Sequence, residues 1–448
     1  MDGPSNSSIV RRPTPLRPGL RLRWPLFRVL ERLTDLRGNT TADKFELAVP
    51  RHPEPAVWVF VSTIGELNAV DPWLRRLTQA LGRHRLVLIT DHSHYRASYE
   101  ARYPQAVVCV SHGHGNDAAA LARHYPPALL AVAEIPALPS DAPCRFSVAF
   151  VVEAKRRGAV LVLVNGWLYG YVPVCTMDAI ERRLFARDYL RAFDMLCVQN
   201  AAIAERLLAL GAKRDAIHVC GNIKFDAMQR PDWSPVRAHS PRLLDALLEQ
   251  GRPVLVAGCV TSDAEQRCVL QAFAVLRQRY ADALLVLAPR HPEVAERMAR
   301  LRELLSQHGM TASFRSELGD NPLPAGQTVL VLDTMGDLRD FYAAATVAHV
   351  GVDHNVLEPL AFERPVSIMP GWEPTYPSYP VFQSLVDAGV LRPAADVATL
   401  SQQWIESVEA GSAHAERMRR TAEALSNAQG AVERHFDAMT PLLGVLHQ

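Results

Sequence analysis

The chain has 448 residues, 48% of them hydrophobic and 21% charged, which is ordinary for a globular protein of about two or three domains. Its 48 basic and 47 acidic side chains give a net charge of +1, which excludes a general nucleic-acid-binding surface. The seven cysteines include no CxxC pair and the amino end shows no signal-peptide pattern, so we expect a reducing, cytoplasmic compartment.

Residues 1–45 are predicted to form an amino-terminal arm. Eight arginines between Met1 and Thr40 outnumber three acidic residues, which gives a local charge of 8 − 3 = +5. Residues 11–37 resemble a basic amphipathic segment on an anionic membrane surface, at the cytoplasmic face of the inner membrane. A disordered arm is the equal alternative, and no transmembrane helix is expected. The apolar side chains interleaved with the arginines are Leu20, Leu22, Trp24, Leu26, Phe27, Leu30 and Leu33.

A first domain is predicted over residues 46–228, where short apolar runs alternate with helical patterns. The run Val57–Ser62 leads into a helix through the turn TIGEL. The later strand-like segments are RLVLIT, AVVCVS, ALLAVAE, AVLVLVN and MLCVQN, with IHVCGNIKFD as the last strand and exit. This alternation predicts a doubly wound parallel sheet. The uncharged stretch 158–177 fits a buried strand plus loop better than a membrane span.

A linker is predicted over residues 229–250, where three prolines interrupt the pattern. The strand–helix alternation restarts at Gly251 and predicts a second Rossmann-like domain over 251–425, with helices near 263–280 and 292–307.

The carboxyl-terminal part is predicted to be helical from Leu400 to about Asn427, followed by a helical segment at 426–448. Pro370–Pro380, with four prolines and two tyrosines, is expected to be a loop at a cleft. Two such domains imply a substrate between them, an architecture common among nucleotide-sugar glycosyltransferases.

The stretch Asp333–Pro359 reads as two consecutive strand-to-helix turns. In a parallel sheet such turns lie at the carboxyl ends of strands, where helix amino termini favour a phosphate. Asn355 and Glu358 share one face of a first helical turn, so Glu358 is placed to take two sugar hydroxyls. The alternative is that Asp333 and Asn355 only cap helices and that Glu358 is an ordinary first-turn carboxylate.

Four loops of the second domain are predicted to form one site at the strand ends. Arg290 suits a nucleotide phosphate, and its alternative is a surface arginine at a helix start. Neither a Walker loop nor a GxGxxG fingerprint occurs, and no HExxH spacing accompanies the histidines, so no cofactor and no metal are predicted. The loops are Gly258–Asp263, Pro289–Glu293, Asp333–Leu338 and Asp353–Pro359.

Seven motifs occur in the order seen in the 3-deoxy-D-manno-octulosonic acid (Kdo) transferase family, and the chain resembles that family over roughly Val57–Arg392. The resemblance implies a GT-B fold, in which an acceptor-binding and a donor-binding Rossmann-like doubly wound domain face a central cleft. It also implies an inverting glycosyltransferase that moves Kdo, or a related 2-keto sugar acid, from CMP-Kdo to a lipid A precursor in lipopolysaccharide biosynthesis. The motifs are TIGEL, AEI (133–135), AKRRG (154–158), GNIKFD (221–226), PRHPE, DTMGDL and HNVLEP.

The resemblance also implies roles for single residues. Glu66 matches the catalytic base, and a carboxylate beside the cleft can accept the proton of an attacking hydroxyl. The alternative is a helix-start glutamate that contributes only about 0.3–1 kcal/mol to stability. The positions matching donor-binding residues are Arg290, Met335, Gly336, Asn355 and Glu358, with Lys224 beside the donor's carboxylate or phosphate. The acceptor or cleft candidates are Thr63, Gly65, Glu134 and Asn165.

Most departures from the family pattern lie in the predicted acceptor half. Thr63 replaces a serine, DHSHYRAS replaces a threonine-rich segment, and NGWLYG from Asn165 replaces another family motif. A paralogue that uses a CMP-sugar with a different glycan or lipid acceptor is therefore the first alternative. A non-catalytic GT-B membrane-associated binding protein is the second, and a GT-B epimerase or UDP-sugar transferase is the third.

Overall fold

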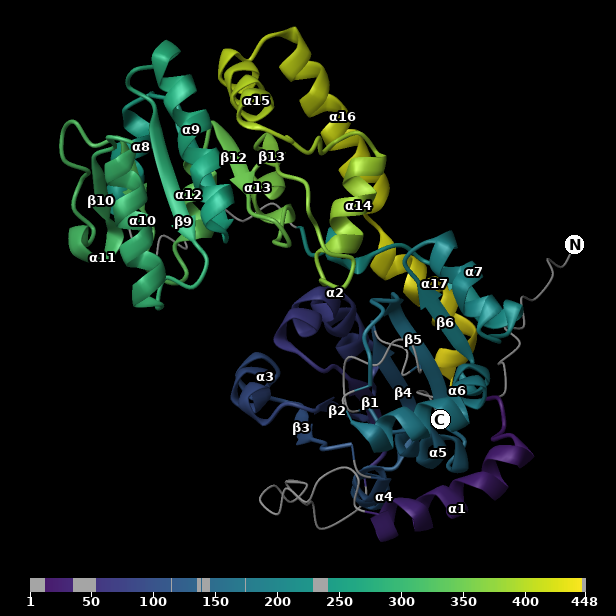
Figure 1. Ribbon diagram of the computed structural model, residues 1–448. Coiled ribbons are helices and arrows are strands. Elements are labelled where there is room, and N and C mark those ends of the chain that lie inside the picture. Colours follow the sequence, from purple (N-terminus) through teal and green to yellow (C-terminus); the bar gives the residue numbers. More distant parts are fainter. Residues whose placement is uncertain are drawn as a thin grey trace, which may run out of the picture. The chain divides into compact units, whose positions relative to one another are not determined.

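The chain divides into two compact units (Figure 1). The first combines Met1–Ala227 with Ala428–Gln448, and the second is Met228–Asn427. Much of the predicted linker, both ends of the predicted arm, Ile135 and Cys144 lie outside the residues that the structure describes. This computed structural model describes residues 13–34, 54–113, 115–134, 138, 146–173, 175–228 and 241–444.

The first unit contains a seven-stranded parallel sheet in the order β3-β2-β1-β4-β5-β6-β7. Its central strands are continuous runs of buried β-branched and leucine residues, as expected when helices cover both faces of a parallel sheet. The strand order reverses between β1 and β4, which is where such sheets bind ligands. The strands are β1 Ala56–Phe60, β2 Arg85–Thr90, β3 Val107–Val110, β4 Pro127–Ala133, β5 Val160–Gly166, β6 Met195–Val198 and β7 Ile217–Val219.

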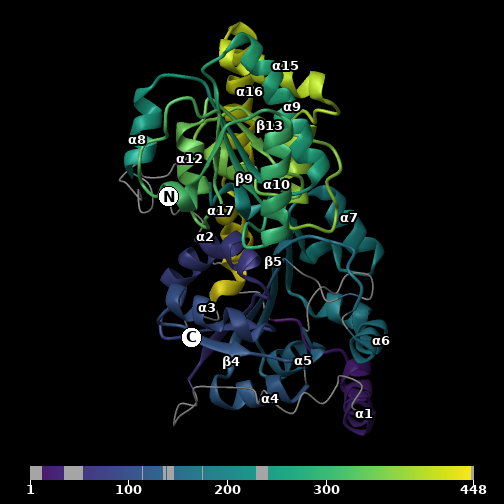
Figure 2. The same cartoon turned by 60° about the vertical axis from the view of Figure 1, so that its left-hand side comes forward.

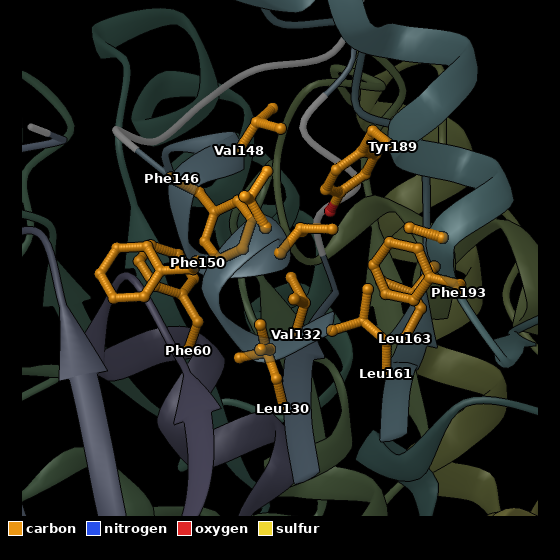
Figure 3. Close-up of a cluster of buried hydrophobic side chains, with 14 of the residues drawn as sticks. Phe60, Leu130, Val132, Phe146, Val148, Phe150, Leu161, Leu163, Tyr189 and Phe193 are labelled. Atoms are coloured by element: carbon orange, nitrogen blue, oxygen red, sulfur yellow. The ribbon is translucent and has the colours of Figure 1, made fainter. Parts of the chain in front are cut away.

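Helices cover both faces of this sheet. Successive side chains of a strand point to opposite faces, so Trp58 and Phe60 join one apolar cluster and Val57 and Val59 the other. Figure 3 shows part of the first cluster, with Phe60 beside the ring of Phe146, which lies just before α5. The helices are α1 Pro18–Thr34, α2 Ile64–Ala80, η1 Ser93–Tyr95, α3 Arg96–Arg102, α4 Gly115–His124, α5 Val148–Arg156, α6 Thr176–Ala192, α7 Ala201–Ala209, η2 Arg214–Ala216, η3 Ile223–Phe225 and α17 Ala431–Leu443.

Helix α1 packs against α6 (Figure 2), which changes the interpretation of the predicted arm. Leu20, Trp24 and Phe27 are buried, and the rings of Trp24 and Phe27 lie 5.6 and 5.4 Å from the ring of Phe185. Arg17 forms an ion pair with Asp188 of α6 at 2.9 Å. These three apolar side chains therefore belong to the core, although the sequence interpretation placed them on a membrane-facing surface. None of the described helices combines the length and apolar character needed to cross a bilayer.

Helix α17 returns to the first sheet from the far end of the sequence. Its apolar side chains are buried beside α2, and the rings of Phe436 and Trp73 lie 6.2 Å apart. The carboxylate of Asp226 accepts the backbone N–H groups of Gly430 and Val432, both at 2.6 Å, and so caps the start of α17. The sequence predicted a helix here but not this packing.

The second unit contains a six-stranded parallel sheet in the order β10-β11-β9-β8-β12-β13, which confirms a second Rossmann-like unit. Its strands are β8 Val254–Val260, β9 Leu284–Pro289, β10 Ala312–Phe314, β11 Val329–Val331, β12 Val347–Val350 and β13 Val366–Ile368. Its helices are α8 Pro241–Glu249, α9 Asp263–Arg279, α10 Ala295–Gln307, α11 Arg315–Leu318, α12 Leu338–Ala344, α13 Leu357–Ala361, α14 Tyr379–Asp387, α15 Val397–Glu409 and α16 Ser412–Ala428.

The helical stretch predicted from Leu400 consists of two helices, α15 and α16. Ala410 ends α15 in the left-handed region with φ 49°, and Gly411 separates it from α16. A left-handed residue at a helix end closes the last turn, so α16 starts in a new direction.

Candidate active site

The turn between β1 and α2 holds the carboxylate of Glu66 in a fixed position. Thr63 caps α2, because its Oγ1 accepts the Glu66 N–H at 3.2 Å and Glu66 Oε2 faces the Thr63 N–H at 3.4 Å. Glu66 Oε2 also accepts the Ser62 N–H at 2.8 Å. The sequence T-x-x-E is the signature of such a capping box. Gly65 lies inside this first turn, where an added Cβ would lie 3.7 Å from Thr63 Oγ1.

The surroundings of Glu66 favour its protonated form. Its residue is 7% exposed, and burial raises its pKa to about 8, with the charges of Glu134 and Asp91 adding to the effect. The backbone N–H groups of Ser62 and Thr63 act in the opposite direction. Glu66 is therefore a strong base for a carboxylate, with a pKa close to the pH at which an enzyme works.

Glu134 and Asn165 follow neighbouring strands with unusual backbone angles. Glu134 has φ 56° and Asn165 has φ 55°, in the left-handed region that costs a non-glycine residue about 1–3 kcal/mol. The same region is occupied at three strand ends of the second unit, by Cys259, His291 and Asp353. Five of the seven described non-glycine residues with positive φ thus lie at strand carboxyl ends, where strain is typical of functional sites.

The carboxylate of Glu134 is fully buried and has three polar partners. Asn165 Nδ2 donates to Oε1 at 2.8 Å, and the Tyr169 hydroxyl donates to Oε2 at 3.1 Å. Lys224 Nζ forms an ion pair with Oε1 at 3.2 Å. Asn165 Oδ1 in turn accepts the N–H of Ile223, which fixes the short helix η3 that carries Lys224.

A second buried cluster contains ligand types that bind metals. One atom each of Cys197, Cys220 and His435 lies within 4.8 Å of the others. His435 Nδ1 donates to the Ala431 carbonyl at 2.6 Å, and its Nε2 accepts the Asn165 N–H at 3.1 Å. Burial lowers the pKa of His435 to about 4, which fits this neutral ring. Both ring nitrogens already have protein partners, so we assign no metal to the cluster.

The second unit has a pocket of about 260 Å³ at the carboxyl ends of β8, β9 and β12. Arg290, which directly follows β9, contributes to its wall and is the one predicted donor-binding residue among its lining residues. The predicted proline-rich loop supplies part of the opposite wall. The lining residues are Thr261, Ser262, Glu265, Arg290, Val352, Asp353, Pro370, Gly371 and Tyr376.

Glu265 ties two loops of this pocket together. Its Oε2 accepts the Thr261 N–H at 3.0 Å, and its Oε1 accepts the Val352 N–H at 3.1 Å. His349 Nε2 lies 3.8 Å from Oε1. Burial alone would raise the pKa of Glu265, but His349 and the backbone N–H groups of Thr261 and Val352 together outweigh it, and the pKa is lowered. Glu265 is therefore a fixed anion that braces the pocket.

Glu358 and Arg290 both act on the thiol of Cys259, near the carboxyl end of β8. Burial raises the pKa of the Cys259 thiol to about 11, and the nearby Glu358 raises it further while Arg290 lowers it. Burial also raises the pKa of Glu358. Asn355 Nδ2 donates to Glu358 Oε1 at 3.3 Å, and Asn355 Oδ1 accepts the Leu357 N–H at 3.1 Å, so Asn355 also has the capping role of the alternative interpretation.

The remaining predicted donor residues lie outside the lining of this pocket. Met335, 80% exposed, and Gly336, with φ 98°, belong to the loop between β11 and α12. Lys224 belongs to the first unit, and its described ion pair is with Glu134.

Sequence analysis missed Glu265, although Ser262-x-x-Glu265 is a capping-box signature like that of Glu66. The pocket-lining Asp353 and Tyr376 belong to loops that the sequence placed at the site and at a cleft, although neither residue was singled out.

A family model described as "3-Deoxy-D-manno-octulosonic-acid transferase (kdotransferase)" matches residues 39–227, which include Glu66, Glu134, Asn165 and Lys224. The resemblance to the Kdo transferase family found in the sequence motifs is confirmed.

Named relatives that are similar to this chain are moderately distant. The 3-deoxy-D-manno-octulosonic acid transferase of Haemophilus influenzae is 29% identical over 257 residues, 56% of this chain and 57% of that protein. That of Chlamydia trachomatis serovar D is 29% identical over 232 residues, 49% of each chain. The chain thus spans about half the length of these relatives. That of Aquifex aeolicus is 25% identical over 333 residues, 69% of this chain and 75% of that protein.

Solved structures show a fold like that of this chain. A UDP-GlcNAc 2-epimerase from Neisseria meningitidis bound to UDP-GlcNAc has a TM-score of 0.57 at 13% identity, over 86% of this chain and 99% of that one. A glycosyltransferase from Rickettsia africae has a TM-score of 0.57 at 10% identity, over 87% and 99%. They confirm a GT-B-like fold of two Rossmann-like units and carry no further argument about activity. The facing of both units across a central cleft stays a prediction.

Proposed function

We propose that this glycosyltransferase moves Kdo, or a related 2-keto sugar acid, from its CMP ester to a membrane-associated acceptor, namely a lipid A precursor in lipopolysaccharide biosynthesis. The observation that carries the proposal is the environment of Glu66, a buried carboxylate that accepts the N–H groups of Ser62 and Thr63 at the strand-order reversal. Its pKa of about 8 suits a general base. The names of the relatives supply Kdo as the transferred sugar, and the motif resemblance implies the CMP ester and the lipid A precursor.

Glu66 is assigned as the base of an inverting displacement. The acceptor hydroxyl oxygen forms a bond to the anomeric carbon of the donor sugar while the bond from that carbon to the phosphate oxygen breaks. The hydroxyl proton passes to Glu66, and CMP leaves with the bonding electron pair. Attack from the side opposite the leaving group inverts the anomeric configuration.

The donor is assigned to the strand ends of the second unit. Arg290 lines the pocket and is matched to the CMP phosphate, because a guanidinium binds phosphate oxygens in a fixed geometry. Glu358 is matched to the ribose hydroxyls and Asn355 supports its carboxylate. Met335 and Gly336 are matched to the base or phosphate through their backbone.

The acceptor is the less supported substrate. Asp91 to Tyr95 stand where the family pattern is rich in threonine, and this segment lies beside the base, because the Ser62 hydroxyl donates to the Asp91 carboxylate. A paralogue with a different glycan or lipid acceptor is therefore the second candidate function. A non-catalytic membrane-associated protein is disfavoured by the retained Glu66, Arg290 and Glu358.

Membrane association is assigned to the outer face of α1 at the cytoplasmic face of the inner membrane. Leu22, Leu26 and Leu33 are 75%, 72% and 79% exposed, although each is a large apolar side chain. Exposed arginines at positions 21 and 32 lie on the same helix. Apolar side chains with flanking arginines suit the interface of an anionic bilayer.

Single-turnover transfer from freshly generated CMP-Kdo to a lipid A precursor tests the proposal. CMP release and product mass are followed together, and hydrolysis is counted separately. A lipid product with one or more added Kdo units supports the proposed function. CMP binding without a lipid product points to another acceptor, and absence of CMP binding contradicts the donor assignment.

A further inference from the structure

The pocket beside Arg290 is small for a complete CMP-sugar. Its volume of about 260 Å³ is below the roughly 300–1,000 Å³ of pockets that enclose drug-sized ligands. Met335, Gly336 and Glu358, which are matched to the nucleotide, are not among its lining residues. Arg290, which is matched to the phosphate, does line it. The pocket therefore has room for one sugar unit attached to that phosphate.

Three polar side chains that line this pocket have unused capacity for hydrogen bonds. Within the described parts of the chain, the Arg290 guanidinium forms no hydrogen bond or ion pair, and the Tyr376 hydroxyl forms no hydrogen bond. Asp353 Oδ1 accepts the Glu373 N–H at 2.8 Å, whereas Oδ2 has no hydrogen-bond donor among the same residues. A guanidinium, a carboxylate oxygen and a phenol around one pocket match the phosphate and the hydroxyl groups of a sugar phosphate.

The loop between β13 and α14 is fastened to the rest of the unit, so its side chains reach the pocket from a defined position. Asp353 holds this loop at two points, because its Oδ1 accepts the Glu373 N–H and its carbonyl accepts the Ser378 hydroxyl, both at 2.8 Å. The ring of Trp372 stacks on an aromatic ring of α14 with 4.4 Å between the centroids. Tyr376 lies between these anchors. A wall that is already ordered loses little conformational entropy when a ligand binds.

The backbone of Asp353 also has an unfavourable conformation. Its φ of 67° lies in the left-handed region, directly after the turn that ends β12. Such a conformation persists only where the surrounding structure holds it, and it is typical of ligand sites. Here the two hydrogen bonds to the loop hold it. Asp353 thus combines a contact that fixes the loop with a carboxylate oxygen that remains available to a ligand.

We propose that this pocket holds the transferred 2-keto sugar acid of the donor, and that the Asp353 carboxylate and the Tyr376 hydroxyl bind its hydroxyl groups. The inference rests on the proposed function, because it divides the assigned donor site into a nucleotide part and a sugar part. Arg290 marks the boundary between the two parts. In the CMP ester of a 2-keto sugar acid, the carboxylate and the phosphate are attached to the same carbon, so both anionic groups belong at the guanidinium.

The chemistry of the two walls sets the orientation of the sugar. A carboxylate oxygen accepts hydrogen bonds from hydroxyl groups but has no donor for a phosphate or a second carboxylate. The acidic end of the donor is therefore directed to Arg290, and its hydroxyl-bearing end to Asp353 and Tyr376. A site that hydrogen-bonds substrate hydroxyls in this way discriminates against a ligand that lacks them.

Titration calorimetry with CMP and with freshly generated CMP-Kdo, both without acceptor, tests the proposal. Asp353→Asn keeps an oxygen for the Glu373 N–H and replaces the other oxygen by an NH₂ group, and Tyr376→Phe removes only a hydroxyl. Both variants are expected to bind CMP like the native chain. The Kd of CMP-Kdo is expected to rise by about tenfold in Asp353→Asn and by about two- to tenfold in Tyr376→Phe.

Matched controls come from α14. Tyr379→Phe removes a hydroxyl that donates to Gln383 Oε1 at 3.0 Å, and Asp387→Asn changes an exposed carboxylate that accepts from Gln383 Nε2 at 2.7 Å. Neither residue lines the pocket, and both controls are expected to bind CMP and CMP-Kdo like the native chain. Native CMP affinity also shows that a variant is folded.

An unchanged CMP-Kdo affinity in either folded pocket variant overturns this inference. An equal loss of affinity for CMP also overturns it, because the nucleotide would then occupy the pocket. Tyr376→Phe alone decides the question where Asp353→Asn does not fold. A native chain that binds neither ligand contradicts the proposed function and this inference together. A native chain that binds CMP-Kdo, with pocket variants that bind it equally well, counts against this inference only.

Discussion

Glu66 and Glu265 occupy the same position in two different helices, the third residue of α2 and of α9, but their pKa values move in opposite directions. Each accepts the N–H group of the residue before the helix cap, from Ser62 at 2.8 Å and from Thr261 at 3.0 Å. The same strand-to-helix turn therefore occurs in both units, with the same local geometry.

The difference comes from the neighbours of each turn. Burial, with the added charge of Glu134, raises the pKa of Glu66 to about 8. Burial also opposes ionisation of Glu265, but His349 and the backbone N–H groups of Thr261 and Val352 together outweigh it and lower the pKa. One turn thus holds a group suited to accept a proton and the other a permanent anion, and such divergence helps to assign roles to paired carboxylates.

Replacing Glu66 by Gln is expected to reduce transfer by about 10²–10⁴-fold, because the amide cannot accept the acceptor's proton. CMP affinity is expected to stay unchanged, since the assigned nucleotide contacts lie in the second unit. Single-turnover rates and CMP titration calorimetry measure the two effects. Glu100→Gln, which removes an exposed carboxylate paired with Arg96 on α3, is the matched control. Full activity of Glu66→Gln would contradict the assignment of Glu66 as the base.

Transfer is expected to be slow at neutral pH and to rise with pH to a half-maximal rate near about 8. The reason is that Glu66 with a pKa of about 8 is mostly protonated at pH 7, and only its ionised form accepts a proton. The pH dependence of kcat/KM for the acceptor measures this. A rate that is already constant from pH about 6 upward would contradict a base with this pKa.

The same carboxylate is expected to make the fold less stable as pH rises. The pKa of Glu66 is raised from 4.5 to about 8 in the folded chain, so the folded state binds its proton more tightly than the unfolded state. This contribution is fully present below pH 4.5 and is lost as pH rises through about 8. The Tm of Glu66→Gln should therefore rise relative to the Tm of the native chain as pH increases through this window. Parallel Tm curves would refute the linkage.

Replacing Arg290 by Ala is expected to weaken CMP binding by about tenfold or more, because a hydrogen bond to a charged group contributes about 1.5–3 kcal/mol. Calorimetric titration with CMP measures the loss of affinity. The same titration with UMP shows whether the cytosine ring contributes separately to binding. Arg300→Ala, an exposed arginine on α10, is the control for general charge. Equal losses in both variants would show that Arg290 has no specific contact.

The two faces of α1 are expected to respond differently to substitution. Trp24→Ala, in the core, should lower the free energy of unfolding by about 3–5 kcal/mol. Leu26→Glu, on the exposed face, should leave unfolding unchanged and reduce binding to anionic vesicles. Denaturant unfolding and vesicle co-sedimentation measure these effects. Undiminished vesicle binding by Leu26→Glu together with Leu22→Glu would show that this face does not contact the membrane.

Local patterns in the sequence predicted much of the fold. The alternation of apolar strands and helices gave both parallel sheets, and the turn TIGEL after the first strand placed the proposed base Glu66 at a strand end. The polar segment after β2 was not assigned a helix, yet it forms η1 and α3, because a single residue, Tyr99, is buried and holds α3 to the turn through hydrogen bonds to Val61 and Thr63.

Contacts between distant segments were beyond the sequence. Lys224 and Glu134 are separated by 90 residues, from 224 − 134, and no periodic pattern connects them. The same holds for His435, whose ring accepts the N–H of Asn165 across 270 residues. Helical spacing identifies an apolar face in α17, but it does not tell which sheet that face covers.

The return of α17 to the first sheet has a consequence for synthesis on the ribosome. The second unit, Met228–Asn427, is encoded as one continuous block and can fold as soon as it emerges. The first unit begins to be made earlier but lacks α17 until the whole second unit has been translated. Until then Asn165 has no His435 to accept its N–H, and Trp73 lacks the ring of Phe436. The unit whose translation starts first is therefore completed after the second unit.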